Sequence, residues 1–371
     1  MTRIKVLETI RQGMVGGGET HVFDLSTHLD QEKYEPIVLS FTEGPMVDNL
    51  RAKGVKTIVI HSKIPFDPRV KKQVKQLLID EKIDLVHAHG SRAASNVLVA
   101  SKELKLPMIY TVHGWSFNDQ QSWWVKKLRV QAEKYITSKV DQVICVSSSN
   151  AETGKEAIPD FSCEVVNNGI SLDKFSNNQS REATRSQLGF QEDEVWVGFI
   201  ARLTFQKDPI NLLKAFMSAS QSNAHLRMLM VGEGELEKEV EDFIKAHDLM
   251  EKVKRMPFQS NVPELLNAID IYSLVSHWEG LPIGLLEAMA SSKAIVASNV
   301  DGTKEIIHDQ QNGILISNAD PEMLKNALLE LASDAVKRER FGAAAFETVK
   351  DRFSLDSMVL ETQSLYNSVS F

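Results

Sequence analysis

The stretch that decides the fold is DIYSLVSHWEGLPIGLLEAMASSKAIVAS, residues 270–298. Residues 270–275 form a short apolar run that predicts a strand. Pro282 suits the first turn of a helix, because its missing N–H would have no partner there. The apolar run after Pro282 continues that helix, and 294–298 read as a second strand. The order strand, turn, helix, strand predicts one repeat of a parallel α/β sheet.

The same alternation runs through the rest of the chain. Short β-branched runs alternate with amphipathic stretches of ten or more residues, which is typical of doubly wound sheets. Strands are predicted at 3–10, 36–41, 56–60, 84–88, 107–112, 141–146, 163–166, 195–201 and 226–231, and helices at 69–80, 91–103, from about 208, and at 235–246.

One polar segment interrupts the pattern. Residues 167–183, NNGISLDKFSNNQSREA, are rich in Asn and Ser and predict a linker. We therefore expect two Rossmann-like domains at 1–175 and 176–353, with 354–371 as a closing helix that packs on the first. Ligands bind outside the carboxyl ends of strands in such sheets, so functional residues should lie in loops that follow strands. Two facing sheets of this kind would form a central cleft.

Composition excludes some classes of function. The chain has 371 residues with 43% hydrophobic and 25% charged residues, ordinary values for a globular protein. No apolar run approaches the length of a membrane span, and the first residues lack a signal-peptide layout. Residues 1–180 carry a net charge of +2 and residues 181–371 a net charge of −10. No basic stripe interleaved with aromatics indicates nucleic acid. We expect a cytoplasmic protein.

The loop and helix at 276–290 carry the strongest functional signal. Glu279 follows a strand, Gly280 allows a tight backbone, and the helix N-terminus offers unpaired N–H groups to a phosphate. Glu287, in the second turn, could accept two vicinal hydroxyls such as those of a ribose. An inward carboxylate on an apolar helix is costly without a partner, which disfavours a purely structural role.

A second loop, in IARLTFQKDP at 200–209, carries Arg202 and Lys207. A diphosphate gains negative charge when it leaves with the electrons of a broken bond. A guanidinium and an ammonium next to it would stabilise the transition state more than the ground state, by about 3 kcal/mol for one preorganised contact. A solvated loop with two surface cations is the alternative.

The spacing Glu279 to Glu287 within EGLPIGLLE resembles the E-x7-E signature of retaining GT-B glycosyltransferases, and the full set of motifs is similar to glycosyltransferase family 4. This resemblance implies a GT-B fold and retaining, metal-independent transfer by a hexosyltransferase. The donor would be a nucleotide-diphosphate sugar, with UDP expected and GDP the alternative, and no cofactor is required. The acceptor would be a glycan or a lipid-linked sugar in cell-surface polysaccharide or glycoconjugate synthesis.

The resemblance also assigns roles to individual residues. Arg202 and Lys207 would hold the diphosphate, Glu287 the ribose, and Glu279 and His113 the transferred sugar. The turns at 16–18 and 231–235 would border the donor, and 258–259 would line the base. The expected catalytic residues are Glu279, His113, Arg202 and Lys207, and the expected donor-binding residues are Gly16, Gly17, Gly18, Arg202, Lys207, Gly232, Gly234, Phe258, Gln259, Glu279, Gly280, Leu281, Pro282, Ile283, Gly284 and Glu287.

Two further features remain open in the first half. His87 and His89 share one face of a strand, but no third ligand is evident, so no metal site is expected. The segment 115–131 sets Trp123 and Trp124 beside basic residues, which suits an anionic bilayer. A solvated helix with its aromatic face in the core is the alternative for this segment.

Two other functions fit the same signals. A sugar-nucleotide epimerase could use the same fold. A non-catalytic sugar-nucleotide-binding protein is the second alternative, and the complete set of Glu279, Glu287, Arg202 and Lys207 argues against it.

Overall fold

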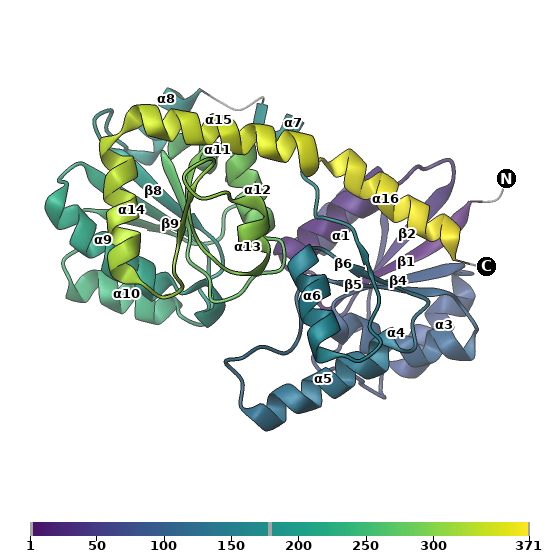
Figure 1. Ribbon diagram of the computed structural model, residues 1–371. Coiled ribbons are helices and arrows are strands. Elements are labelled where there is room, and N and C mark those ends of the chain that lie inside the picture. Colours follow the sequence, from purple (N-terminus) through teal and green to yellow (C-terminus); the bar gives the residue numbers. More distant parts are fainter. Residues whose placement is uncertain (1–2, 177–179, 370–371) are drawn as a thin grey trace. The chain divides into compact units, whose positions relative to one another are not determined.

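The computed structural model describes residues 3–176 and 180–369, and the chain separates into two compact units (Figure 1). Unit 1 comprises residues up to Gly169 together with those from Leu355 onward, and unit 2 comprises Ile170–Ser354. The boundaries predicted from the sequence lie after residues 175 and 353.

Unit 1 is built on seven strands. They alternate with helices along the chain. Its elements are β1 (Ile4–Ile10), α1 (Gly17–His28), β2 (Tyr34–Ser40), α2 (Pro45–Ala52), β3 (Lys56–Val59), α3 (Lys71–Asp80), β4 (Leu85–His89), α4 (Ser91–Glu103), β5 (Met108–Val112), α5 (Trp123–Thr137), β6 (Gln142–Cys145), α6 (Ser148–Ala157), β7 (Glu164–Val165) and α16 (Leu355–Ser368).

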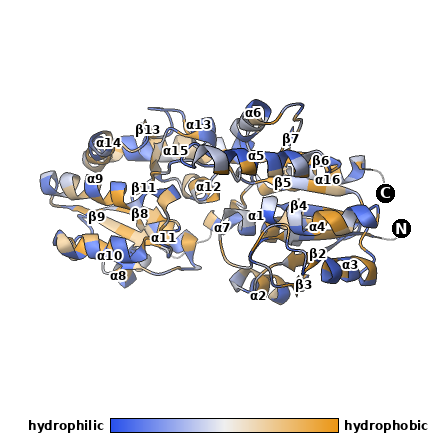
Figure 2. Cartoon of the chain, turned by 90° about the horizontal axis from the view of Figure 1, so that it is seen from below, coloured by the Kyte–Doolittle hydropathy of each residue, from blue (hydrophilic) through white to orange (hydrophobic). Residues whose placement is uncertain are grey.

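The strands of unit 1 form one parallel sheet in the order β3-β2-β1-β4-β5-β6-β7. Strands rich in Val, Ile and Leu read as continuous apolar runs because helices cover both faces of such a sheet. The hydropathy colouring shows these residues gathered on the strands (Figure 2). The strand order reverses between β1 and β4, which is where ligands bind in doubly wound folds.

The C-terminal helix α16 packs on unit 1, as the sequence predicted. Its buried residues Met358, Val359 and Tyr366 join a core cluster that includes Val6 of β1 and Leu25 of α1. This packing adds the last segment of the chain to the sheet face that α1 also covers.

Unit 2 repeats the same plan with six strands. Its elements are α7 (Asp173–Ser176), α8 (Arg181–Leu188), β8 (Val195–Ile200), η1 (Phe205–Lys207), α9 (Pro209–Ser222), β9 (Leu226–Val231), α10 (Glu237–Ala246), β10 (Val253–Met256), α11 (Val262–Ala268), β11 (Ile271–Leu274), α12 (Ile283–Ala290), β12 (Ala294–Ser298), α13 (Asp301–Ile306), β13 (Ile314–Ile316), α14 (Pro321–Ser333) and α15 (Ala335–Arg352).

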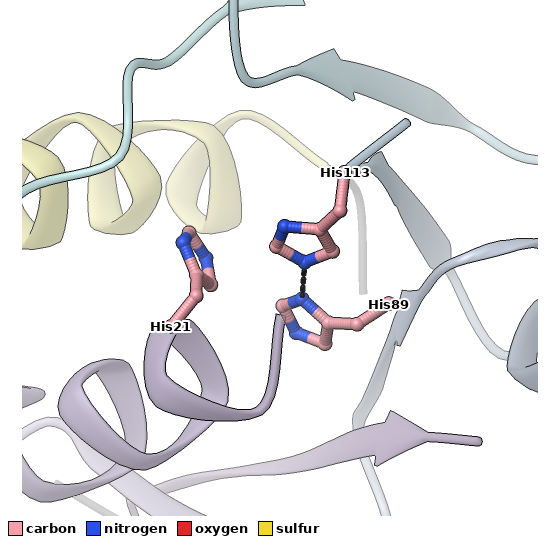
Figure 3. Close-up of side chains that lie close together, drawn as sticks. All are labelled: His21, His89 and His113. Carbon is pink, nitrogen blue, oxygen red and sulfur yellow. Dashed lines mark hydrogen bonds between the residues drawn. The ribbon is translucent and has the colours of Figure 1, made fainter. Parts of the chain in front are cut away.

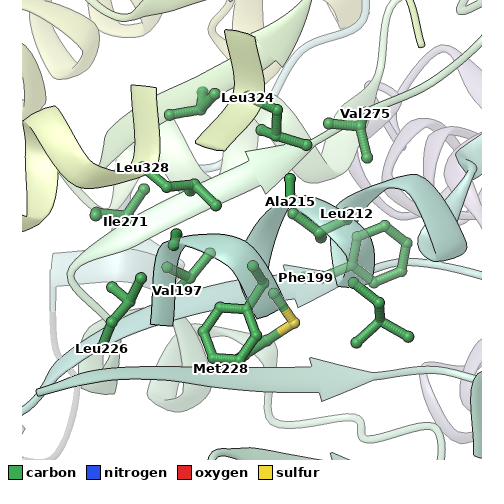
Figure 4. Packing of buried hydrophobic residues seen from close by; sticks show 14 of the residues in the cluster. Val197, Phe199, Leu212, Ala215, Leu226, Met228, Ile271, Val275, Leu324 and Leu328 are labelled. Carbon is green, nitrogen blue, oxygen red and sulfur yellow. The ribbon is translucent and has the colours of Figure 1, made fainter. Parts of the chain in front are cut away.

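The parallel sheet of unit 2 has the order β10-β9-β8-β11-β12-β13, with its reversal between β8 and β11. Leu212 of α9 and Leu328 of α14 pack with Val197 and Ile271 of the strands in one buried cluster (Figure 4). Burying each such side chain stabilises the unit by about 1.5–3 kcal/mol.

The structure differs from the sequence reading in two places. Pro282 is the N-cap of α12 in an extended conformation, so the helix begins at Ile283 rather than at Pro282. The predicted linker 167–183 contains α7 and the start of α8, and its residues 177–179 lie outside the described residues. Ser180 caps α8 by accepting a hydrogen bond from the Ala183 N–H. Part of the polar composition of 167–183 thus belongs to the start of a helix.

A helix that spans a membrane needs about 20 predominantly apolar residues. Within residues 3–176 and 180–369, none combines the length and the apolar character that a membrane span requires.

Candidate functional site

The carboxyl ends of β8 and β11 lie side by side at the strand-order reversal of unit 2. The loop after β8 carries Arg202 and Lys207, and the loop after β11 carries Glu279. Hydrogen bonds join the two loops, from the His277 N–H to the Gln206 carbonyl (2.8 Å) and from the Gln206 side chain to the Trp278 carbonyl (2.8 Å). Residues 72 positions apart in the chain are thus held together.

Glu279 is buried and well partnered. Its Oε1 accepts a hydrogen bond from Lys207 and another from the Ser276 hydroxyl at 2.5 Å, and its side chain is only 5% exposed. A buried carboxylate needs such partners to remain charged. The pair of predicted residues Lys207 and Glu279 therefore meets in the structure, while Ser276 was not singled out by the sequence.

A second close backbone contact supports the Glu279 loop. A methyl group on Gly302, at the start of α13, would lie 1.6 Å from the Gly280 carbonyl oxygen, so only glycine fits there. The adjacent Asp301 adopts a left-handed conformation, with φ of 23°. Burial raises the pKa of the Asp301 carboxyl, against a hydrogen bond from the Glu279 backbone that lowers it.

Glu287 lies on the side of α12 that meets the end of β8. A methyl group on Gly284 would lie 4.0 Å from the Glu287 carboxylate and 3.8 Å from the Ile200 carbonyl. The carboxylate and the end of β8 therefore lie on the same side of α12. Burial, followed by the charge of Glu287, raises the pKa of the Tyr272 hydroxyl, which itself donates to that carbonyl. Glu287 is half-buried, and its carboxylate lies near the end of β8.

Arg202 differs from Lys207 in its surroundings. Its side chain is exposed and makes no hydrogen bond or ion pair within the part of the chain that the structure describes. A guanidinium fork held at a loop without a partner remains available to an anion.

The two glycines of the turn after β9 have a structural role. A methyl group on Gly232 would lie 2.0 Å from the Ala201 carbonyl, and one on Gly234 would lie 2.2 Å from the Leu203 carbonyl. The close neighbour of this turn is thus the backbone of the Arg202 loop. The glycines position that loop, a role that the sequence analysis did not consider.

Other predicted donor-side residues lie around the same edge. Phe258 and Gln259 follow β10, and the Phe258 ring is 40% exposed. Leu281, Pro282 and Ile283 are buried at the start of α12.

In unit 1 the three predicted glycines open α1. Gly16 is extended, with φ of 179°, so any residue could adopt its backbone conformation. A methyl group on Gly17 would meet nothing within 4 Å, and one on Gly18 would lie 3.5 Å from Cδ2 of His113. These glycines are not required by a tight turn. Of the three, only Gly17 leaves free space, because a methyl group on Gly16 would lie 2.5 Å from Oε2 of Glu19 and one on Gly18 would contact His113.

His113 belongs to a group of imidazoles that the sequence placed far apart. Its Nε2 lies 3.1 Å from Nδ1 of His89, and its ring meets His21 edge-on at a centroid distance of 4.8 Å (Figure 3). Burial, followed by the neighbouring His21, lowers the pKa of His113 well below its usual range. Neither His21 nor its partner Asn168, at 3.0 Å, was predicted as a site residue.

Behind this group lies a buried acidic residue, Glu8 of β1. Its Oε2 lies 2.8 Å from Nε2 of His89 and 3.1 Å from Nδ1 of His87, and its Oε1 accepts a hydrogen bond from Tyr366 at 2.6 Å. Burial opposes the charge, but His87 and the hydrogen bonds of both histidines outweigh it and hold the Glu8 pKa far below normal. The parallel register places Glu8 opposite His87, so no local motif announces this contact.

Two sets of these side chains have metal-ligand character. One nitrogen each of His21, His89 and His113 lie within 4.8 Å of one another, and so do ligand atoms of Glu8, His87 and His89. The third ligand that the sequence lacked is thus present. The hydrogen bond between His89 and His113 occupies two of these nitrogens with a shared proton, however, so the arrangement as it stands is a hydrogen-bond network.

The predicted membrane segment 115–131 ends in the first turns of α5. Trp123 is 77% exposed and Trp124 is 59% exposed, while Lys127 and Arg129 are exposed on the same helix. The alternative of an aromatic face packed in the core is therefore wrong for these two tryptophans.

Both units are doubly wound parallel sheets, with the candidate residues on loops at the carboxyl ends, which defines the GT-B class of fold. Residues 15–174 match Glycosyltransferase Family 4, and residues 180–348 match Glycosyl transferases group 1. The chain is thus a member of the GT4-like glycosyltransferases, an enzyme of the hexosyltransferase type.

Individual relatives agree with this assignment. UDP-Gal:alpha-D-GlcNAc-diphosphoundecaprenol alpha-1,3-galactosyltransferase of Escherichia coli is 26% identical over 83% of this chain and 82% of its own. The putative glycosyltransferase EpsD of Bacillus subtilis (strain 168) is 24% identical over 82% of both. The crystal structure of HepE from Anabaena in complex with UDP-glucose has a TM-score of 0.88, with 21% identity, over 99% of this chain and all of that one.

Proposed function

We propose that this glycosyltransferase moves a hexose from a UDP-sugar to a glycan or lipid-linked acceptor in the synthesis of a cell-surface polysaccharide or glycoconjugate. The observation that carries the proposal is the buried Lys207–Glu279 pair at the strand-order reversal of unit 2. Arg202 of the same loop as Lys207 has no side-chain partner among residues 3–176 and 180–369. A diphosphate is the ligand that two cations beside a helix start would hold.

In this proposal each donor-side residue contacts a different part of the nucleotide sugar. Arg202 and Lys207 bind the diphosphate together with the backbone N–H groups at the start of α12. Glu287 accepts hydrogen bonds from the ribose hydroxyls, and Phe258 lies beside the base. The Glu279 carboxylate accepts hydrogen bonds from hydroxyls of the transferred sugar. Lys207 and Ser276 hold that carboxylate in one orientation.

Unit 1 would supply the contacts to the sugar and to the acceptor. His113 offers a neutral ring next to Gly18, and the space at Gly17 leaves room for a sugar to approach the backbone. A lipid-linked acceptor is suggested by the name of the Escherichia coli relative, whose substrate is a diphosphoundecaprenol-linked sugar. The exposed Trp123 and Trp124 of α5 would rest on the membrane that carries such an acceptor.

We also propose that transfer retains the anomeric configuration and needs no metal. The bond from the anomeric carbon to the phosphate oxygen breaks with its electrons moving to the phosphate. The acceptor oxygen forms its bond on the same face, and the leaving phosphate takes the acceptor's proton. Arg202 and Lys207 would neutralise the charge that develops, a task that a metal performs in other transferases.

A nucleotide panel tests the proposal. UDP and UDP-glucose should raise the melting temperature of the protein more than GDP does, since a ligand that binds only the folded state stabilises it. Glu287→Ala should remove the shift, whereas the exposed control Lys238→Ala should keep it. Equal shifts for wild type and Glu287→Ala would contradict the ribose assignment.

Turnover separates the competing activities. Release of UDP only when a polyprenyl-diphosphate sugar is added indicates transfer, and conversion of the UDP-sugar without acceptor would indicate an epimerase. Binding without any turnover would indicate a non-catalytic protein. Activity should persist in EDTA, and proton NMR of the product should show the anomeric configuration of the donor. Loss of activity in EDTA or an inverted product would contradict the mechanism.

A further inference from the structure

The histidine network of unit 1 has a direction that its hydrogen bonds dictate. Glu8 is ionised and can only accept, so the facing Nε2 of His89, at 2.8 Å, must carry a proton. A neutral imidazole has one N–H. Nδ1 of His89 is therefore a bare acceptor.

The same reasoning extends one ring further. Nε2 of His113 lies 3.1 Å from Nδ1 of His89, so Nε2 must be the donor in that bond. His113 then has its one proton on Nε2 and a bare lone pair on Nδ1. That Nδ1 is buried and has no hydrogen-bond partner within the described residues.

Both rings remain neutral near neutral pH. Burial, followed by the charge of His87, lowers the pKa of His89 to about 4, although Glu8 acts in the opposite direction. The pKa of His113 is also well below its usual range because of burial. Protonation of His89 would reverse the chain of donors and turn Nδ1 of His113 into a donor.

We propose that Glu8 and His89 are positioning residues that hold His113 in the tautomer with its proton on Nε2, so that Nδ1 accepts a hydrogen bond from a hydroxyl of the bound sugar. We call the hydrogen-bond chain from Glu8 through His89 to His113 the relay. Nδ1 of His113, which has no partner within the described residues, is its end. The part of the inference that concerns the sugar rests on the proposed function, whereas the tautomer does not.

Access to this nitrogen is limited by its neighbours. Nδ1 lies on the side of the His113 ring that faces His21 (Figure 3), and no hydrogen bond joins these two rings. Contact between a hydroxyl and the buried Nδ1 therefore requires that the His21 ring shift aside when the sugar binds. A hydroxyl is the fitting group because an ether, carbonyl or carboxylate would bring a second lone pair against the first.

The tautomer is tested on the ligand-free protein. Nitrogen NMR of the full chain labelled with ¹⁵N-histidine, assigned with His113→Gln and His89→Gln, should show protonated Nε2 and unprotonated Nδ1 in both rings. A proton on Nδ1 of His113 would overturn the proposal. This readout needs no substrate, and the tautomers are read from the wild-type chain, with the two variants used only for assignment.

Variants test the source of the tautomer. The amide of Glu8→Gln can donate as well as accept a hydrogen bond, so it no longer requires a proton on Nε2 of His89. His113 should then populate both tautomers. Tyr366→Phe removes a different hydrogen bond to Glu8 and should keep the single tautomer, although it also destabilises the protein. An unchanged tautomer in folded Glu8→Gln would contradict the relay.

Affinity connects the tautomer to the sugar. Glu8→Gln should weaken binding of UDP-glucose about tenfold, the effect of one hydrogen bond, and leave the affinity for UDP unchanged. The exposed control His61→Gln should change neither. Equal affinities of wild type and Glu8→Gln for UDP-glucose, with the NMR result as expected, would remove the sugar contact and retain the tautomer. Failure of wild type to bind UDP at all would instead contradict the proposed function.

A metal titration tests the remaining alternative, that the histidine cluster is a metal site. Zinc chloride added to the metal-free protein should leave the His113 signals in place at equimolar concentration. A tight one-to-one zinc complex that is lost in His21→Gln would make the cluster a metal centre and overturn the relay, because coordination displaces the proton between His89 and His113.

Discussion

Tyr366, in the last turns of α16, donates a hydrogen bond of 2.6 Å to Glu8 of β1, a residue 358 positions earlier in the chain. Both side chains are fully buried. The hydroxyl also lies 2.6 Å from Nδ1 of His87, so the C-terminal helix contributes directly to the polar network of unit 1. The last helix is thus part of the site's support as well as of the core.

Tyr366→Phe should lower the free energy of unfolding by about 1.5–3 kcal/mol. The phenyl ring keeps the packing, but the charged Glu8 loses one of its donors in a buried position. Urea unfolding of the variant measures the loss. Tyr135→Phe, at a side chain exposed by about half, is the control and should stay within about 0.5 kcal/mol of wild type. Equal midpoints for the two variants would contradict this role of Tyr366.

Lys207 and Arg202 should respond differently to removal. Lys207→Met leaves Glu279 buried with a charge but without its cation, so it should destabilise unit 2 by about 3–5 kcal/mol as well as weaken UDP binding. Arg202→Gln should weaken UDP binding with no change in melting temperature, because Arg202 is exposed. Calorimetric titration and thermal melts of both variants check this contrast. A large loss of stability in Arg202→Gln would show that its role is structural.

Gly17→Ala tests whether a ligand uses the space beside α1. The added methyl meets nothing within 4 Å, so stability should be unchanged or slightly higher. If the sugar approaches this backbone, affinity for UDP-glucose should fall about tenfold while affinity for UDP stays the same. Identical UDP-glucose affinities for Gly17→Ala and wild type would leave Gly17 without a role in binding.

Acid should destabilise the folded chain before the carboxylates titrate. The pKa of His89 is lowered to about 4 and that of His21 to about 3 from the usual 6.5, in both cases by burial first. Below pH 6.5 His89 and His21 are protonated in the unfolded chain but stay neutral in the folded chain. The free energy of unfolding should therefore fall, by up to about 1.4 kcal/mol per pH unit for each ring, as pH drops from 6.5 toward 4.

The groups that face these rings are Glu8, His87 and His113. The depressed pKa of Glu8 contributes stability that is present above pH 4.5 and is lost only below it. Urea unfolding at several pH values measures the slope. His21→Gln should reduce it, whereas His61→Gln should not, and a flat profile for wild type between pH 4 and 6.5 would contradict the neutral, buried state of these histidines.

If α5 contacts the membrane as proposed, removal of its two tryptophans should reduce binding to vesicles without loss of stability. Trp123→Ala with Trp124→Ala should reduce co-sedimentation with phosphatidylglycerol vesicles at least tenfold, because aromatic side chains insert at the bilayer interface. Phosphatidylcholine vesicles should bind wild type more weakly, since Lys127 and Arg129 are cationic. Leu360→Ala, also at an exposed apolar residue, is the control. Equal sedimentation of all proteins would exclude α5 as the contact.

Local patterns were sufficient to predict the elements and part of the site. The apolar runs and their spacing predicted β8, β9, β12 and α4 within a residue of their observed bounds. The loops after β8 and β11 were predicted as functional because carboxyl ends of parallel strands share one edge. Lys207 and Glu279 do meet there.

Other assignments needed the tertiary structure. Gly232 and Gly234 looked like a ligand-binding turn, but the atoms against them belong to residues 201 and 203 of another loop. Glycine patterns report only that something approaches closely and do not identify what approaches. The predicted start of α12 was off by one residue because Pro282 fits a cap as well as a first turn.

By itself, the sequence determined the fold class, the two repeated units and the charged loops, because periodicity and turn chemistry act over a few residues. Only the tertiary structure decided that Glu8, His89 and His113 form one chain of hydrogen bonds and that Tyr366 closes it. These residues come from β1, β4, the end of β5 and α16, and strand register and helix packing bring them together. Side-chain protonation then depends on burial and on partners distant in sequence, which no local pattern encodes.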